Sequence, residues 1–83
     1  GNDALLVATT GTYNTIIGCL AGDAITTASD NTFVGGKAGG ANTTGTMNTF
    51  MGVGSGDAVT TSSYNVAIGG NALGAATTDK ARW

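Results

Sequence analysis

The sequence predicts an all-β fold, a β-solenoid (a β-roll or β-helix) of about five 17-residue coils. Three observations support this prediction: an internal repeat in strict register, many β-branched residues within it, and a glycine at one fixed place in each copy. When each winding lies on the previous one, columns of equivalent residues are preserved. We therefore expect one repeat domain over residues 1–81, with coils at 1–13, 14–30, 31–47, 48–64 and 65–81, and a boundary at 82–83.

The length of the repeat is set by asparagines that recur every 17 residues and open the segments NTIIG, NTFVG, NTFMG and NVAIG. A pair of threonines recurs in all five copies, from Thr9-Thr10 to Thr77-Thr78. Helical hairpin repeats need more than about 30 residues and leucine-rich repeats at least about 20. Seventeen residues suit one coil of two or three short strands with turns between them. The asparagines are Asn14, Asn31, Asn48 and Asn65.

Stacked coils give each column a predicted role. Coils about 4.8 Å apart would make a body roughly 20–25 Å tall, in which the asparagine amides form a hydrogen-bonded ladder. The glycine column fits a corner that needs a positive φ or close backbone approach. A column of small residues, such as Ala21, Ala38 and Ser55, fits an inside corner. The glycines of the corner column are Gly18, Gly35, Gly52 and Gly69.

Two neighbouring apolar columns follow the Asn-Thr pair in each repeat. Adjacent side chains of a strand point to opposite faces, so the pattern predicts that both faces are buried. A thin coil has only one inside, and we expect another copy of the chain to cover the second face by symmetric self-association. The columns are Ile16, Phe33, Phe50 and Ala67, and Ile17, Val34, Met51 and Ile68.

Composition and charge narrow the function classes. Charged residues make up 10% of the chain and the net charge is −2, so we expect no nucleic-acid binding. No apolar run approaches the roughly 20 residues of a membrane span, and membrane insertion is not expected. The single Cys19 has no internal disulfide partner. Gly1 falls in the middle of a repeat, which suggests a segment of a longer protein. The repeat decays at Arg82 and Trp83, which indicates either a cap against end-to-end stacking or the entry to another domain.

The first 18 residues, GNDALLVATTGTYNTIIG, carry a family resemblance. They resemble the Gly-x-x-Ala-Leu-x-x-x-Thr-Thr-Gly-x-x-Asn-Thr-x-Ile-Gly repeats of bacteriophage tail fibres and related bacterial surface fibres. The chain is more distantly similar to the β-roll heads of trimeric autotransporter adhesins. The resemblance covers residues 1–81, but the leucine after the small residue survives only at Leu5 and Leu73.

This resemblance implies a parallel homotrimer, intertwined or side by side, with coils stacked along the fibre. The implied function is that of a structural shaft or head segment supporting host or surface attachment. The location would be a virion tail fibre, the extracellular space or a cell surface, with any host receptor bound through another domain. Pattern alone does not separate these settings, nor a trimer from another closed assembly.

The residues argue against an enzyme. The chain has no histidine and no glutamate, and Cys19 has no candidate base. Asp23 and Asp57 share a column two coils apart, roughly 9–10 Å, at the outer edge of an inverting glycosidase pair. Without further substrate-binding residues nearby, solvated turn aspartates are the simpler interpretation. Gly36-Lys37 precedes Ala38 where a phosphate-binding Walker motif requires Ser or Thr, so no cofactor is expected. Calcium binding is disfavoured because the period does not match a calcium β-roll.

Two other functions remain open from the sequence. Stacked threonines could form an ice-binding array, although adjacent threonines of an extended chain point to opposite sides. Alternatively, 83-residue units could stack end to end into an extracellular filament. One further column, Tyr13, Asp30, Met47 and Tyr64, is expected to face solvent or a neighbouring chain.

Overall fold

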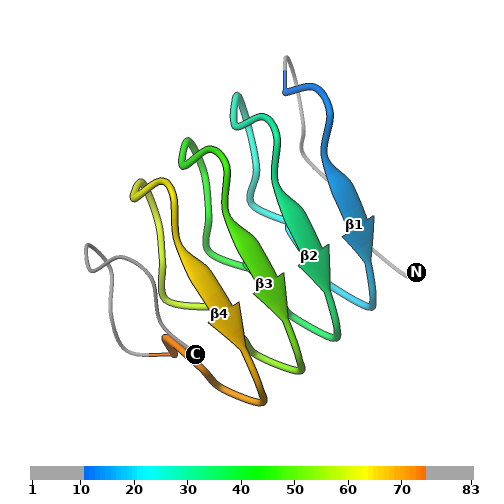
Figure 1. Ribbon diagram of the computed structural model, residues 1–83. Helices are drawn as coiled ribbons and strands as arrows, with labels where there is room; N and C mark the ends of the chain where they lie inside the picture. Colours follow the sequence, from blue (N-terminus) through cyan, green and yellow to red (C-terminus); the bar gives the residue numbers. More distant parts are fainter. Residues whose placement is uncertain (1–10, 75–83) are drawn as a thin grey trace.

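The computed structural model describes residues 11–74, which form four short strands and the turns between them. The strands are β1 (Thr15–Ile17), β2 (Thr32–Val34), β3 (Thr49–Met51) and β4 (Val66–Ile68). They pair in parallel in the order β1-β2-β3-β4 and make one sheet (Figure 1). The described residues contain no helix, and the predicted all-β class is confirmed.

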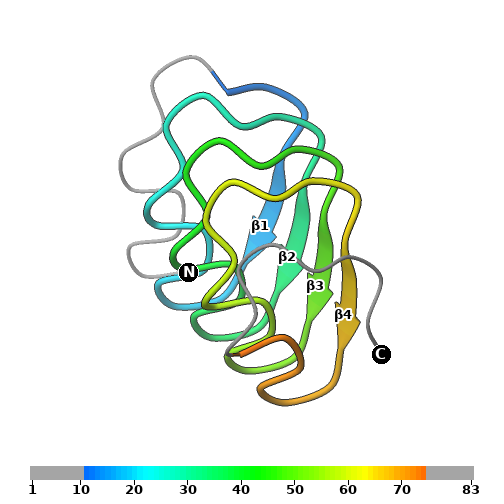
Figure 2. The same ribbon diagram turned by 90° about the vertical axis from the view of Figure 1, so that its left-hand side faces the viewer.

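Each strand pairs with the strand one repeat further along the chain. Thr15 lies beside Thr32, and Thr32 lies beside Thr49. Between strands the chain completes one winding and returns to the same face, as the stacked loops of Figure 2 show. The described part therefore winds as a solenoid-like stack with a 17-residue period.

Each complete winding contributes only one three-residue strand, where the sequence predicted two or three. The rest of the winding consists of consecutive tight turns. In the coil that begins with β3, hydrogen bonds run from Ser55 N to the Gly52 carbonyl, then from Asp57 N to Gly54 and from Val59 N to Gly56. Each bond joins residues three apart, which is the spacing of a β-turn and leaves no room for a second extended segment.

Hydrogen bonds between coils continue through these turns. Gly22 N donates to the Ala38 carbonyl, and Gly39 N donates to Ser55, each at 2.9 Å. Lys37 N donates to the Cys19 carbonyl at 2.8 Å. Because the turns are bonded to one another much as strands are, they satisfy backbone groups that would otherwise be buried without partners.

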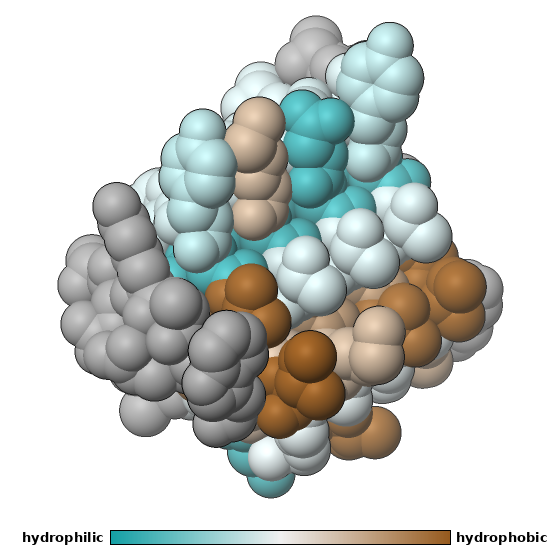
Figure 3. Space-filling view, viewed as in Figure 1, coloured by the Kyte–Doolittle hydropathy of each residue, from teal (hydrophilic) through white to brown (hydrophobic). Residues whose placement is uncertain are grey.

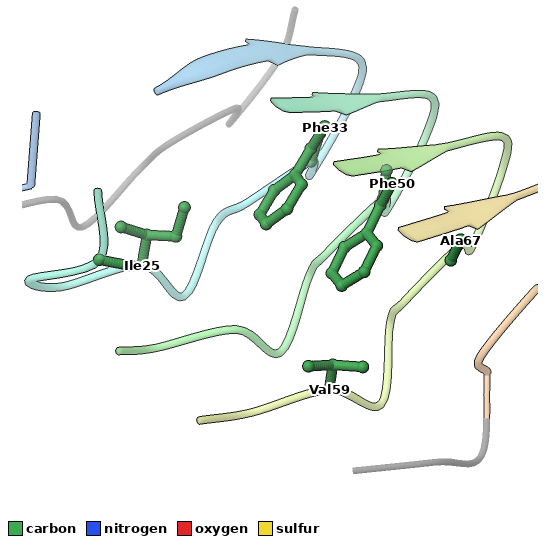
Figure 4. Close-up of a cluster of buried hydrophobic side chains, with 8 residues drawn as sticks. Ile25, Phe33, Phe50, Val59 and Ala67 are labelled. Atoms are coloured by element: carbon green, nitrogen blue, oxygen red, sulfur yellow. The ribbon is translucent and has the colours of Figure 1, made fainter. Parts of the chain in front are cut away.

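The core lies between the sheet and the opposite side of each winding (Figure 4). Phe33 and Phe50, one coil apart, are fully buried, and their rings stack with centroids 4.9 Å apart. Ile25 and Val59, also fully buried, belong to the core on the opposite side. The two aromatic rings, stacked at about the strand spacing, pack one coil against the next inside the winding.

Two positions six residues apart in a coil share the same space in the core, so the size of one side chain limits the size of the other. Gly39 follows Phe33 by six residues, and a Cβ at Gly39 would lie 2.3 Å from the ring. In the coil of β4 the small residue is Ala67, and its partner six residues later is Leu73, which packs against the core. A large residue at one position therefore accompanies a small residue at the other.

Several predictions lie outside the described residues. These are most of the coil at 1–13, the end of the coil at 65–81, the threonine pairs Thr9-Thr10 and Thr77-Thr78, and the boundary at 82–83. The count of five coils stays a prediction.

Candidate interaction face

The outer side of the sheet carries an exposed apolar row that runs across all four strands. Ile17 is 57% exposed, Met51 43% and Ile68 50%, while Val34 is half-buried. Figure 3 shows brown atoms of this row crossing the strands, beside a paler row. The paler row follows the first strand position at Thr15, Thr32 and Thr49, and the apolar Val66 takes this position in β4.

The alternation of side chains along each strand produces this row. The middle residue of each strand points into the winding, and Phe33, Phe50 and Ala67 are fully buried there, with Ile16 half-buried. The third residue points away from the winding and is left open in the single chain. The sequence predicted that both faces are buried, but the chain by itself buries only the inner face.

The asparagine column holds the coils together through the backbone of the next coil. Asn14 Oδ1 accepts a hydrogen bond from Asn31 N at 3.0 Å, and Asn31 Oδ1 accepts one from Asn48 N at 2.9 Å. The side-chain amide of Asn31 donates to the Gly45 carbonyl at 2.9 Å. The sequence predicted a ladder of amide-to-amide bonds, but among residues 11–74 only Asn65 Nδ2 donates to a neighbouring amide, at Asn48 Oδ1. Asn31 and Asn48 are fully buried, so these bonds satisfy polar groups that water does not reach.

The corner glycines follow the strands at positions where neighbouring coils approach closely. Their φ angles lie between 119° and 129°, a region that side chains rarely adopt. A Cβ at Gly35 would lie 2.7 Å from the carbonyl oxygen of Gly52 in the next coil. The same clash would occur at Gly18 and Gly52, so this column fixes the spacing of the stack at the end of each strand.

The clearest pocket of the described residues lies on the turns. It has a volume of about 250 Å³ and is lined by Asp23, Asp57 and Lys37 together with Leu20, Gly40 and Ala41. The two aspartates that the sequence placed in one column thus share a pocket, separated by the coil of Gly40. The described residues contain no group of three histidine, cysteine or acidic side chains able to hold a metal. Cys19 is a free, exposed thiol.

The threonine pairs divide into two rows of different character. The hydroxyl of Thr26 donates to the Thr43 carbonyl, and the hydroxyl of Thr43 donates to Thr60, each at 3.3 Å. The first threonine of these two pairs therefore bonds to the backbone of the next coil. The second threonine is exposed, as at Thr27 and Thr44.

Sequence reasoning missed one polar residue of the core. Asn42 is fully buried in the column that holds Ile25 and Val59, and its Oδ1 has no hydrogen-bond partner. Its Nδ2 donates to the Gly45 carbonyl at 3.0 Å, which also accepts the bond from Asn31. Comparison of the column across repeats could have shown it, because both neighbouring coils carry an aliphatic residue there.

No helix among the described residues is long and apolar enough to cross a membrane. Searches of protein-family models, curated proteins and solved structures each find no significant match to this chain.

Proposed function

We propose that the chain is a structural shaft or head segment of a parallel homotrimeric fibre of the tail-fibre or surface-adhesin kind. In this arrangement three copies bury their outer apolar rows against one another around a common axis. The observation that supports this proposal best is the row itself, because it continues without interruption over all four strands. A continuous apolar stripe on a rigid sheet is typical of an interaction surface.

The direction of the row favours an axis parallel to the stack. Equivalent residues of consecutive strands lie beside one another, so the row runs straight along the direction in which coils are added. An axis along that direction keeps each coil of one copy level with the same coil of the others. All copies then meet through the same residues, as a closed symmetric assembly requires.

The energy per coil suits a long shaft. Full burial of an aliphatic side chain is worth about 1.5–3 kcal/mol, so a half-exposed one gains about 1 kcal/mol on association. Association costs about 4–15 kcal/mol in lost freedom. The rows of the four described strands supply about 4 kcal/mol per copy, which reaches only the lower end of that cost, and each added coil contributes again. Such an interface becomes stable by repetition, which fits a spacer that positions a receptor-binding domain elsewhere.

Light scattering on the purified chain tests this proposal. We expect a molar mass three times the 8.0 kDa of one chain. The Met51→Asp substitution places a charge in the row and should give a monomer. Thr44→Asp, at an exposed threonine on the other side of the winding, should leave the trimer intact. A strictly monomeric wild type would contradict the proposal, and polydisperse growth would favour an end-to-end filament.

A second candidate, ice binding, is favoured by one feature of the same face. Thr15, Thr32 and Thr49 form a straight outward row at the strand spacing, beside the apolar row. A regular hydroxyl and methyl array on a flat sheet is a surface that could match ice. Ice binding requires this face open, whereas the fibre requires it covered. Thermal hysteresis from a monomer would support ice binding, and a trimer without hysteresis would support the fibre.

A further inference from the structure

Exposed side chains lie before and after each strand of the sheet, several of them at positions with a positive φ angle. Before each strand stands a row that we name the ridge, with φ angles of 57–63°. After each strand stands a second row, the trailing flank, in which the second residue of each pair also has a positive φ angle. The ridge is Tyr13, Asp30, Met47 and Tyr64, and the trailing flank is Cys19-Leu20, Gly36-Lys37, Val53-Gly54 and Gly70-Asn71.

The ridge side chains gain little from their own chain. A left-handed backbone costs about 1–2 kcal/mol at a residue other than glycine. A buried turn with similar φ angles uses glycine at Gly22, Gly39 and Gly56. Yet Tyr13 is 84% exposed and Tyr64 is 63% exposed, so burial within the chain does not offset the strain. Large side chains at such positions indicate a contact outside the single chain.

The symmetry of the proposed trimer places the ridge of one copy beside the trailing flank of the next copy. Three sheets that face a common axis form a ring, in which the leading edge of each sheet adjoins the trailing edge of the next. A ridge residue and the flank residues that follow the same strand lie at nearly the same height in the stack. In the ring, each ridge residue therefore lies level with the trailing-flank residues that follow the equivalent strand of the neighbouring copy.

The ridge and trailing-flank side chains are complementary beside the two middle strands, β2 and β3. Asp30 is the only charged residue of the ridge, and Lys37, the one basic residue in the described part of the chain, follows the same strand, β2. On either side of the next strand, β3, Met47 is 48% exposed and Val53 is 67% exposed. Opposite charges thus share one level and exposed apolar side chains share the next.

We propose that the ridge of each copy packs against the trailing flank of the neighbouring copy, coil against equivalent coil. Asp30 then lies opposite Lys37 of the next copy, and Met47 lies opposite its Val53. This inference rests on the proposed trimer and identifies the contacts that set its rotational order and its coil alignment. A shift by one coil would separate Asp30 from Lys37 and place Met47 opposite a charged or polar flank.

A cysteine at the ridge tests the contact through the natural Cys19. Tyr13→Cys should form a disulfide with Cys19 of the next copy under mild oxidation. Because each chain then links to the next, a non-reducing denaturing gel should show covalent trimers. Tyr64→Cys is the matched control, since it lies three coils away, about 14 Å along the stack, and should stay monomeric on the gel.

Light scattering on the same variants separates the two proposals. A non-covalent trimer whose Tyr13→Cys variant forms no cross-links would overturn the ridge contact and leave the fibre standing. Equal cross-linking of Tyr64→Cys would also overturn it, because the coils would not be aligned. Monomeric protein without cross-links would overturn both.

The charge pair gives an independent test. Asp30→Lys should raise the trimer dissociation constant several-fold, and Lys37→Asp should do the same. The double variant restores the opposite charges and should return close to the wild-type value at low salt. Additive losses in the double variant would contradict the placement of Asp30 opposite Lys37.

Discussion

The coils of β2 and β3 and the coil of β4 fill the same interior in opposite ways. The earlier coils place a phenylalanine on the strand and a glycine six residues later, as in Phe50 and Gly56. The coil of β4 places Ala67 on the strand and Leu73 at the later position. A Cβ at Gly56 would lie 2.4 Å from the Phe50 ring, so the two large residues exclude each other.

This difference shows that the winding conserves volume and not residue type. The later position keeps a positive φ in both cases, at 61° for Gly56 and 55° for Leu73. A leucine is therefore accepted in a backbone shape that favours glycine when the space inside requires it. The same backbone winding thus tolerates a sequence change only if its partner position changes as well.

The largest predicted effect comes from removing one ring. Phe50→Ala should lower the free energy of unfolding by about 3–5 kcal/mol, because it leaves a cavity beside Phe33. Adding Gly56→Leu to this variant should recover part of the loss, because the pair then copies the coil of β4. Urea unfolding at one protein concentration measures both. A double variant less stable than Phe50→Ala would show that the exchange is not transferable between coils.

A second comparison concerns two corner glycines, one that is covered by the backbone of the next coil and one that is not. Gly35→Ala should cost about 3 kcal/mol or more, because its Cβ meets the Gly52 backbone, which cannot move without separating the coils. Gly69 has a similar φ of 119°, but no described atom lies within 4 Å of a Cβ there. Gly69→Ala should therefore cost only the torsional strain, about 1–2 kcal/mol.

Thermal unfolding of the two alanine variants, followed by circular dichroism, provides the measurement. The difference between them isolates the contact between coils from the strain of the backbone. Equal losses would mean that coil spacing is not set by the glycine corner.

The smallest predicted effect is a gain in stability. Asn42→Val should raise the free energy of unfolding by about 1 kcal/mol, because it removes a buried oxygen without a partner. The Gly45 carbonyl keeps its bond from Asn31, so no new unpaired group is created. Asn48→Ala is the control and should destabilise, since Asn48 Oδ1 accepts a bond from Asn65 N. Chemical denaturation of both variants checks the opposite signs.

The stacking itself could be predicted from the sequence because equivalent positions share one environment in every coil. The 17-residue spacing of Asn31 and Asn48 predicted neighbours, and Asn48 N indeed donates to Asn31 Oδ1. The corner glycines were predicted for the same reason: the close approach recurs at each winding.

The number of strands in each winding, the partners of the asparagine amides and the number of copies depend on interactions that a repeat pattern does not reveal. One strand per winding follows from left-handed turns at residues such as Leu20 and Lys37, whose types do not indicate that shape. The preference of asparagine amides for backbone carbonyls depends on the position of Gly45 and its counterparts after folding. The number of copies in the assembly is decided by surfaces between chains, and the pattern of one chain indicates only that a face needs covering.

Pairwise disulfide trapping tests the central claim, that each winding lies directly on the next, most directly. Thr46 Oγ1 and Ser63 Oγ, one repeat apart, lie 3.3 Å from each other. In a Cys19→Ser background, the pair Thr46→Cys and Ser63→Cys should oxidise within one chain and lose both thiols. Thr12→Cys with Ser63→Cys, three windings or about 14 Å apart, should keep both. Free thiols in the first pair, or equal oxidation of the second, would contradict the stacked winding.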